Sequence, residues 1–259
     1  IQNIQTITLN ASGANVDLTG QTEGLTITGG AGNDTITGGS GNDTIAGAAG
    51  TDIITGAGGS DTISLGSSDS ASDVVIFNSS SGLDIINQFV AGASGDIMKF
   101  TDNLTDMAAN QTSGGNDIDN LISADFAIFS TTSTINTTKL IIGFNTAITQ
   151  NGLTFGSAID FTGAGISASQ VLGAIETSLE NANAGSGTGL LSGQGAQVVQ
   201  ADAQEKKLLL FTDGGSGSAE DIAIVHYNEG SASEADFSGE LTLTSVIKSI
   251  DLATLTHDN

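Results

Sequence analysis

The chain has 259 residues with 29 acidic and only 5 basic side chains, so its formal net charge at pH 7 is −24. This charge argues against nucleic acid or an anionic membrane as a direct partner, and it suits a protein that binds divalent cations. The sequence contains no cysteine, which excludes disulfides and thiolate metal sites, and no apolar run approaches the ~18 residues of a transmembrane helix.

The same nine-residue spacing of apolar residues runs through the first 64 residues, but the first 28 lack the features of a metal site. Counted back in steps of nine from residue 36, the inward strand residues are Ile27, Leu18 and Leu9, and the sixth place holds Leu25, Val16 and Ile7. Apolar packing therefore takes the place of polar groups in these coils. We expect residues 1–28 to form metal-poor coils of one continuous roll.

A complete nine-residue repeat occupies residues 29–64. Two close copies, 29–37 and 38–46, read GGAGNDTIT and GGSGNDTIA, and two looser copies, 47–55 and 56–64, keep an aspartate in sixth place. The pattern is the G-G-x-G-x-D-x-U-x nonapeptide of parallel β-rolls, in which U is a large apolar residue. Glycine permits the sharp turn that the first six residues must make. The last three residues predict a short strand whose apolar side chain points inward.

The spacing of the aspartates predicts a metal site. Two repeats make one coil, so turns 18 residues apart should stack, with Asp34 over Asp52 and Asp43 over Asp61. Two carboxylates so close repel each other unless a cation lies between them. Carboxylate oxygens together with the carbonyl oxygens of a glycine-rich turn are the ligands that Ca²⁺ selects. The alternative, a flexible linker, gives no reason for an apolar residue at every ninth position.

The repeat loosens after residue 64, where strand-like segments at 73–77, 82–89 and 95–100 predict the end of the roll. Phe89 and Phe100 should plug its open core. We therefore expect a mainly β chain, with a parallel β-roll over 1–100 whose calcium-binding coils and cap span 29–100. A strand and loop region should follow at 101–166, and one α-helix with further strands at 167–259.

The helix is predicted over 167–183, because Ser167 or Ser169 can cap it and apolar residues follow at helical spacing. The sequence G-G-N-D at 114–117 imitates the repeat but stands alone, so we expect a loop there. A turn is predicted at 213–217, between two strands of a hairpin. The predicted strands lie at 126–129, 140–144, 197–200, 206–212, 221–227 and 240–244, and the chain closes with 246–255.

The repeats, followed by Asp84-Ile85-Ile86-x-x-Phe89 and Asp96-Ile97-x-x-Phe100, resemble the RTX family. These are calcium-binding proteins exported by the type I secretion machinery of Gram-negative bacteria. The segment 208–227 is similar to the end of serralysin-type RTX domains, which implies an export signal near the C-terminus. The composition, rich in Thr, Ser, Ala, Gly and Asn, is similar to that of RTX-type surface-layer (S-layer) proteins, whose lattices depend on calcium.

The resemblance also implies ligands for several Ca²⁺ ions, in which one turn and the next stacked turn each give carbonyl oxygens and an aspartate. The first ion would use Gly30, Gly32, Asp34, Gly47, Ala49 and Asp52. The second would use Gly39, Gly41, Asp43, Gly56, Gly58 and Asp61. A third could use Ala48, Gly50, Asp52 and Asp73, and further ions could use Asp69, Asp84 or Asp96.

Motifs for catalysis are missing or isolated. The zinc motif H-E-x-x-H and the hydrolase motif G-x-S-x-G are absent, and the match of 245–248 to S-x-x-K has no companion motif. His226 and His257 are better explained as strand and tail residues than as ligands. We therefore expect no enzymatic activity.

Two functions remain open. One is a calcium-dependent S-layer protein, secreted to the bacterial surface, whose partners are calcium, copies of itself and the type I secretion machinery. The other is a folding and export module of a larger secreted enzyme, toxin or adhesin. The chain begins at Ile1 without a signal segment, so we expect part of a longer protein.

Overall fold

The computed structural model describes residues 5–66, 70–78, 82–91, 95–100, 126–129, 141–144, 148–150, 153–155, 161–163, 166–183, 206–212, 220–228 and 241–250. They divide into two compact units. The first contains the described residues from 5 to 100 together with Thr244–Ile250, and the second contains those from 126 to 243. The described chain is mostly β with a single helix, as the sequence predicts.

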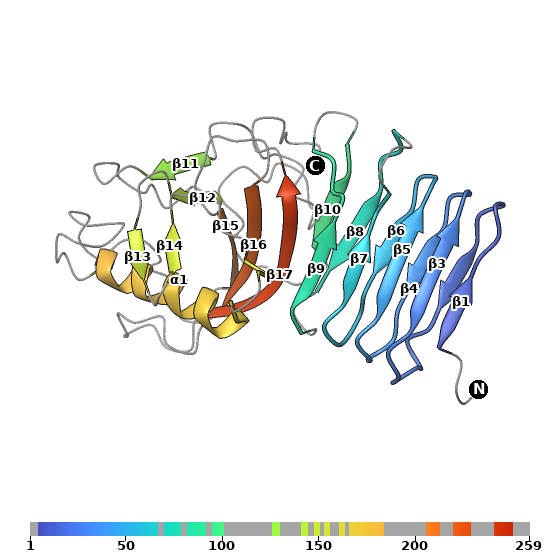
Figure 1. Ribbon diagram of the computed structural model, residues 1–259, viewed down its shortest axis with the longest axis horizontal. Helices are drawn as coiled ribbons and strands as arrows, with labels where there is room; N and C mark the ends of the chain where they lie inside the picture. The colour runs from blue at the N-terminus through green and yellow to red at the C-terminus, as the bar shows by residue number, and fades with distance from the viewer. Residues whose placement is uncertain are drawn as a thin grey trace. The chain divides into compact units, whose positions relative to one another are not determined.

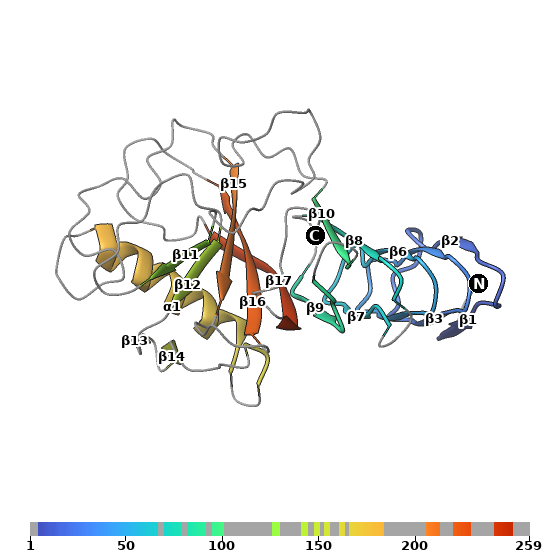
Figure 2. The ribbon, with the colours of Figure 1, turned by 90° about the horizontal axis from the view of Figure 1, so that it is seen from above.

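The first unit is a roll of parallel coils, in which successive strands alternate between two sheets (Figures 1 and 2). Every pairing between neighbouring coils is parallel. One sheet holds the odd-numbered strands β1 (Thr6–Thr8), β3 (Thr26–Gly30), β5 (Thr44–Ala48), β7 (Thr62–Ser64) and β9 (Asp84–Asn87). The other holds the even-numbered strands β2 (Asn15–Asp17), β4 (Thr35–Thr37), β6 (Ile53–Thr55), β8 (Val74–Phe77) and β10 (Ile97–Phe100).

The apolar residue of each strand lies in the core between these sheets. In the odd-numbered sheet Ile27 pairs with Ile45 and Ile45 with Ile63, and in the even-numbered sheet Ile36 pairs with Ile54. All five side chains are buried. The predicted stacking at 18 residues is therefore confirmed for the repeats. Later coils are longer, with 21 residues from Asp52 to Asp73 and 23 from Asp61 to Asp84.

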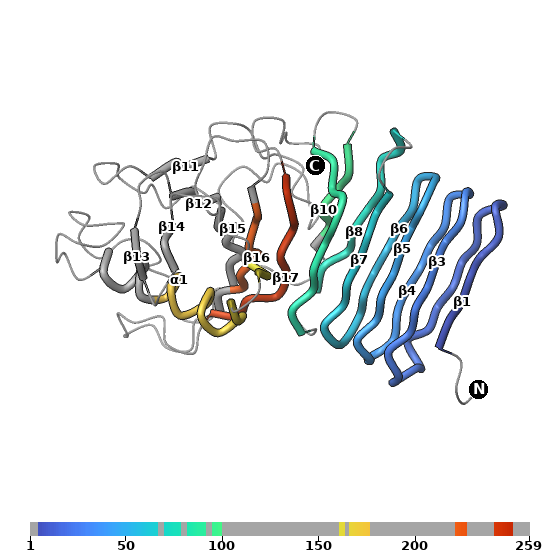
Figure 3. Tube along the Cα trace, viewed as in Figure 1, coloured from blue at the N-terminus to red at the C-terminus, as the bar shows by residue number. Residues whose placement is uncertain are grey.

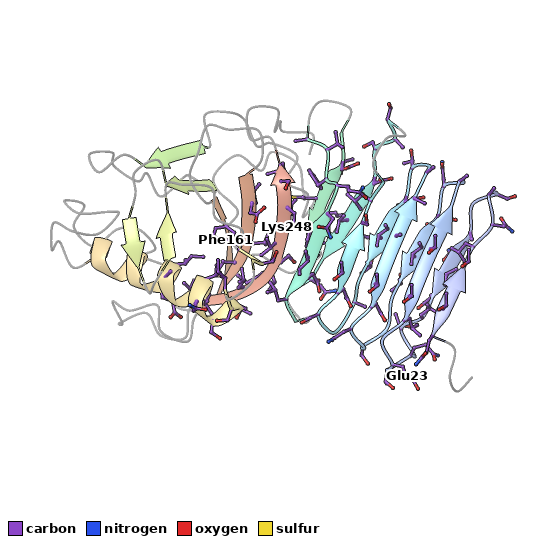
Figure 4. All side chains as sticks on the ribbon, in the orientation of Figure 1. Glu23, Phe161 and Lys248 are labelled. Atoms are coloured by element: carbon purple, nitrogen blue, oxygen red, sulfur yellow. The ribbon has the colours of Figure 1, made fainter. Side chains whose placement is uncertain are left out.

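The first coil is also longer, which makes the nine-step count upstream of residue 25 wrong. Ile7 pairs with Ile27 and Val16 pairs with Ile36, so Ile7 and Val16 are the inward strand residues. The coil has 20 residues from Ala14 to Asp34. The turn after β2 takes up the extra length, and the Gln21 N–H donates to the Leu18 carbonyl within it. Figure 4 labels Glu23 on this turn.

Strand β17 (Leu241–Ile250) extends the odd-numbered sheet of the roll. It pairs in parallel with β9, placing Val246 opposite Ile85 and Ile247 opposite Ile86. The sequence predicts two segments here, 240–244 and 246–255, whereas the structure has one strand that crosses residue 245. Phe89 is buried near this end of the roll, as expected. The side chain of Phe100 lies outside the described residues.

The second unit contains the strands β11 (Phe126–Phe129), β12 (Ile141–Phe144), β13 (Ile148–Gln150), β14 (Leu153–Phe155), β15 (Lys206–Thr212) and β16 (Glu220–Asn228). The pair β15–β16 is antiparallel, which confirms the expected hairpin pairing, and β11 and β12 continue the sheet in parallel beside β15. β13 and β14 form a separate antiparallel pair. The segments 114–117, 197–200 and 213–217 lie outside the described residues.

Helix α1 (Ala168–Asn183) begins where the sequence predicts it. The Ser167 hydroxyl accepts the Gln170 N–H at 3.2 Å, and the Gln170 side-chain oxygen accepts the Ser167 N–H at 3.0 Å. This reciprocal cap satisfies two backbone donors at the helix start. Val171, Ala174 and Ile175 form its buried face. The tube in Figure 3 follows this helix and the coils of the roll.

The second place of the repeat generates a testable prediction. Ala48 and Ala57 have φ of 79° and 76°, a left-handed conformation that glycine adopts without strain, as Gly30 does in the first repeat. We expect Ala48→Gly and Ala57→Gly each to raise the free energy of unfolding in saturating calcium by about 0.5–1 kcal/mol, because relieved strain exceeds the added chain entropy.

Chemical denaturation measures this gain, and Ala46→Gly in strand β5 is the matched control. Ala46 has no positive φ, so the same substitution should lower stability there. A loss of stability at all three positions would show that the turns do not hold Ala48 and Ala57 in the left-handed conformation.

Candidate metal centre

The aspartates of the turns form two columns along the roll. The first column, in the turns that lead from odd to even strands, contains Asp34, Asp52, Asp73 and Asp96. Each Oδ1 accepts the backbone N–H of the aspartate one coil earlier, at 2.8 Å, 2.8 Å and 2.9 Å along the column. The second column contains Asp43, Asp61 and Asp84, with the same bonds at 2.8 Å and 2.9 Å. The structure thus confirms the expected stacking and continues it past the repeats.

These bonds tie neighbouring coils together through backbone as well as side chain. The Asp34 carbonyl accepts the Ile53 N–H and the Asp43 carbonyl accepts the Thr62 N–H, both at 2.8 Å. The upstream coil completes both columns with backbone donors, since the Ala14 and Leu25 N–H groups donate to Asp34 and Asp43 at 2.6 Å and 2.8 Å. The sequence gives no signal for these two donors, because Ala14 takes its place only through the longer coil.

The second carboxylate oxygen creates an electrostatic problem. Asp34 and Asp61 are each 1% exposed, and neither Oδ2 atom has a hydrogen-bond partner. A buried carboxylate oxygen without a donor is costly. Burial raises the pKa of Asp61 to about 6, the Asp43 N–H opposes this rise, and the Asp43 carboxylate adds to it. The columns therefore lack positive charge on the side that the Oδ2 atoms face.

The first glycine of each repeat leaves the space for such a charge, and we call this space a cradle. A Cβ atom on Gly29 would lie 2.6 Å from Asp34 Oδ2 and would also collide with the Gly47 carbonyl oxygen. A Cβ atom on Gly38 would meet Asp43 Oδ2 at 2.5 Å and the Gly56 carbonyl oxygen. Each cradle thus gathers a carboxylate oxygen and a carbonyl oxygen from the next coil.

Two more cradles follow in the looser repeats. A Cβ atom on Gly47 would lie 2.6 Å from Asp52 Oδ2 and 3.0 Å from the Leu65 carbonyl oxygen, and one on Gly56 would collide with Asp61 Oδ2. Carboxylate and carbonyl oxygens are the donors that Ca²⁺ prefers. The donor set of the cradles therefore fits calcium. Among the described residues, no three His, Cys, Asp or Glu side chains group as a metal site, so backbone carbonyls must supply ligands.

Other expected ligands lie in the same turns but also hold the turns together. The carbonyls of Gly30 and Gly39 accept the N–H groups of Ala49 and Gly58, both at 2.9 Å. A carbonyl oxygen has two lone pairs, so one hydrogen bond leaves a lone pair for a cation. The carbonyls of Gly32 and Gly41 lie against the α-carbons of Gly50 and Gly59 in the next coil. Asp69 lies outside the described residues.

The fifth place of the repeat adds a feature that sequence reasoning missed. The side-chain oxygens of Asn33 and Asn42 accept the N–H groups of Thr51 and Ser60, at 3.0 Å and 2.9 Å. The recurrence of asparagine at this place, directly before the aspartate, was the available signal. These bonds fix the turns on their outer side, so the aspartates stay aligned on the inner side.

The raised pKa of Asp61 predicts that acid and calcium act in opposite directions. Without metal, the folded pKa of about 6 exceeds the ordinary 3.8, so Asp61 favours the folded roll at low pH and disfavours it as pH rises through 6. With calcium bound, the cation lowers the carboxylate pKa values, so the stability they contribute is present at neutral pH and is lost as pH falls.

Circular dichroism between pH 4 and 7.5 should therefore show β structure that increases with acid in metal-free protein and decreases with acid in excess calcium. The same direction of change under both conditions would contradict this assignment of the buried carboxylates.

The comparisons with known proteins agree with this geometry. Residues 26–69 match the family model of the RTX calcium-binding nonapeptide repeat, in four copies. No curated protein and no solved structure matches the chain. In the part of the chain that the structure describes, no helix has the length and apolar character to cross a membrane. Residues 26–69 are thus a run of RTX calcium-binding nonapeptide repeats, folded as the centre of a parallel β-roll.

Proposed function

We propose that the chain is a calcium-dependent structural protein of a bacterial surface layer, in which Ca²⁺ drives both the folding of the roll and self-assembly. The observation that carries the calcium dependence is the pair of buried carboxylate columns, whose Oδ2 atoms at Asp34 and Asp61 have no hydrogen-bond donor. Proteins with this repeat are typically secreted. The surface-layer role adds a function to that module, supported by the composition and by one face of the roll.

The outer face of the even-numbered sheet offers a surface for a second copy. Along one row, Asn15 and Thr35 give way to Ile53, Val74 and Ile97 in successive strands. Ile53 is 39% exposed, and Val74 and Ile97 are partly exposed. An exposed apolar row in so acidic a chain marks a candidate contact surface.

Charge complementarity on this face favours a second copy as the partner. The neighbouring row runs in register through Asp17, Thr37, Thr55, Ile76 and Lys99, so opposite charges stand at its two ends. A two-fold axis parallel to the strands would set Asp17 of one copy against Lys99 of the other. Such a small contact is weak alone, but many identical contacts add up in a lattice.

The role we propose is structural rather than catalytic, with export through the type I secretion machinery and a signal in the C-terminal part. The alternative is a folding and export module of a larger secreted enzyme, toxin or adhesin. A roll that forms one compact unit with its own closing strand β17 is also suited to that role. Assembly distinguishes the two functions.

Electron microscopy of the purified protein in millimolar calcium should show ordered two-dimensional sheets that dissolve in chelator. Ile53→Glu should abolish the sheets while circular dichroism shows the same calcium-induced folding. Thr44→Glu is the matched control, because Thr44 is exposed on the opposite sheet. Protein that folds with calcium but stays monomeric at every concentration would support the module and contradict the surface layer.

A further inference from the structure

The strand register shows which residue stands at the cradle position in each coil of the roll. In the first column the order is Leu9, Gly29, Gly47 and Leu65, because Leu9 follows the Thr8–Thr28 pair and Leu65 follows the Ala46–Ser64 pair. In the second column the order is Leu18, Gly38, Gly56 and Phe77. Glycine therefore occupies only the two middle positions of each column.

Large apolar side chains fill the positions after the glycines. Leu65 and Phe77 are fully or almost fully buried, and each lies two residues after an inward strand residue, on the same face of its strand. Even a single Cβ atom in a cradle would stand 2.6 Å from a carboxylate oxygen, as at Gly47. A leucine or phenylalanine side chain at this position therefore takes the space that a cation would need.

The last aspartate of the first column differs from the others in its hydrogen bonds. Asp96 Oδ1 accepts the Asp73 N–H at 2.9 Å, and Asp96 Oδ2 accepts the Val90 N–H at 2.7 Å. By contrast, Asp34 Oδ2 has no hydrogen-bond partner. Backbone N–H groups directed at both oxygens stabilise a carboxylate anion without a metal. Asp96 thus receives from the backbone what Asp34 must receive from a cation.

We propose that the roll holds at most four calcium ions, beside Gly29, Gly38, Gly47 and Gly56, and that apolar side chains end both columns. Leu9 and Leu18 close the upstream ends, and Leu65 and Phe77 close the downstream ends. Asp73 and Asp84 reach cations only from the far side of the cradles beside Gly47 and Gly56. Asp96 is a metal-free end cap. This inference rests on calcium binding by the repeats, and it is independent of the surface-layer role.

Isosteric variants at the two ends of the first column test the inference. Asparagine keeps the Oδ1 acceptor for the neighbouring N–H but removes the charge. Asp34→Asn should lose at least one bound calcium ion or weaken its binding tenfold or more. Asp96→Asn should keep the wild-type number of ions, although its melting temperature should fall because an amide N–H₂ then faces the Val90 N–H.

Filling a cradle tests the same inference from the opposite direction. Gly47→Ala should lose one ion, because the new Cβ atom would stand in the cradle against Asp52 Oδ2 and the Leu65 carbonyl oxygen. Gly20→Ala is the matched control, since its Cβ atom would have no neighbour within 4 Å, and the number of ions should not change.

Titration calorimetry and equilibrium dialysis on the full chain give the ion counts, in physiological salt so that weak surface binding is screened. Circular dichroism reports whether each variant folds. More than four tightly bound ions, loss of an ion in Asp96→Asn, or a full complement in Gly47→Ala would each overturn the four-cradle assignment. Wild-type protein that binds no calcium would instead overturn the calcium function itself.

Discussion

The roll depends on one interaction, the stacking of aspartate on aspartate through a backbone N–H and a side-chain Oδ1. The bond fixes the coils in register, but it also brings carboxylates together in a buried place. Their Oδ2 atoms then face a space that only a missing side chain keeps open. The arrangement that gives the roll its order therefore also creates its requirement for a cation.

A single backbone geometry supports two kinds of packing in this unit. In the middle coils, glycine at the cradle position and aspartate in sixth place leave an oxygen-lined space. In the flanking coils, Leu9, Leu18, Leu65 and Phe77 occupy the equivalent position, so hydrophobic burial replaces the cation. The choice at one position in each coil decides whether metal or apolar contact stabilises that coil.

The sequence predicts the roll where its spacing is constant and fails where the spacing changes. The repeats of nine gave the stacking of Asp34 on Asp52 and the inward Ile residues. The 20-residue first coil shifted Ile7 and Val16 into the strand position, because a turn can lengthen without altering the apolar pattern around it. The pairing of β17 with β9 could not be predicted, since it joins segments far apart in the chain and no local pattern encodes the partner.

The most direct test of the account is far-UV circular dichroism of the full chain at pH 7, first in calcium and then in excess chelator. If uncompensated buried carboxylates control the fold, chelation should remove the β signal of the roll, and restored calcium should bring it back. A β spectrum that is unchanged in chelator would show that the roll closes without a cation, and would contradict the central role of the aspartate columns.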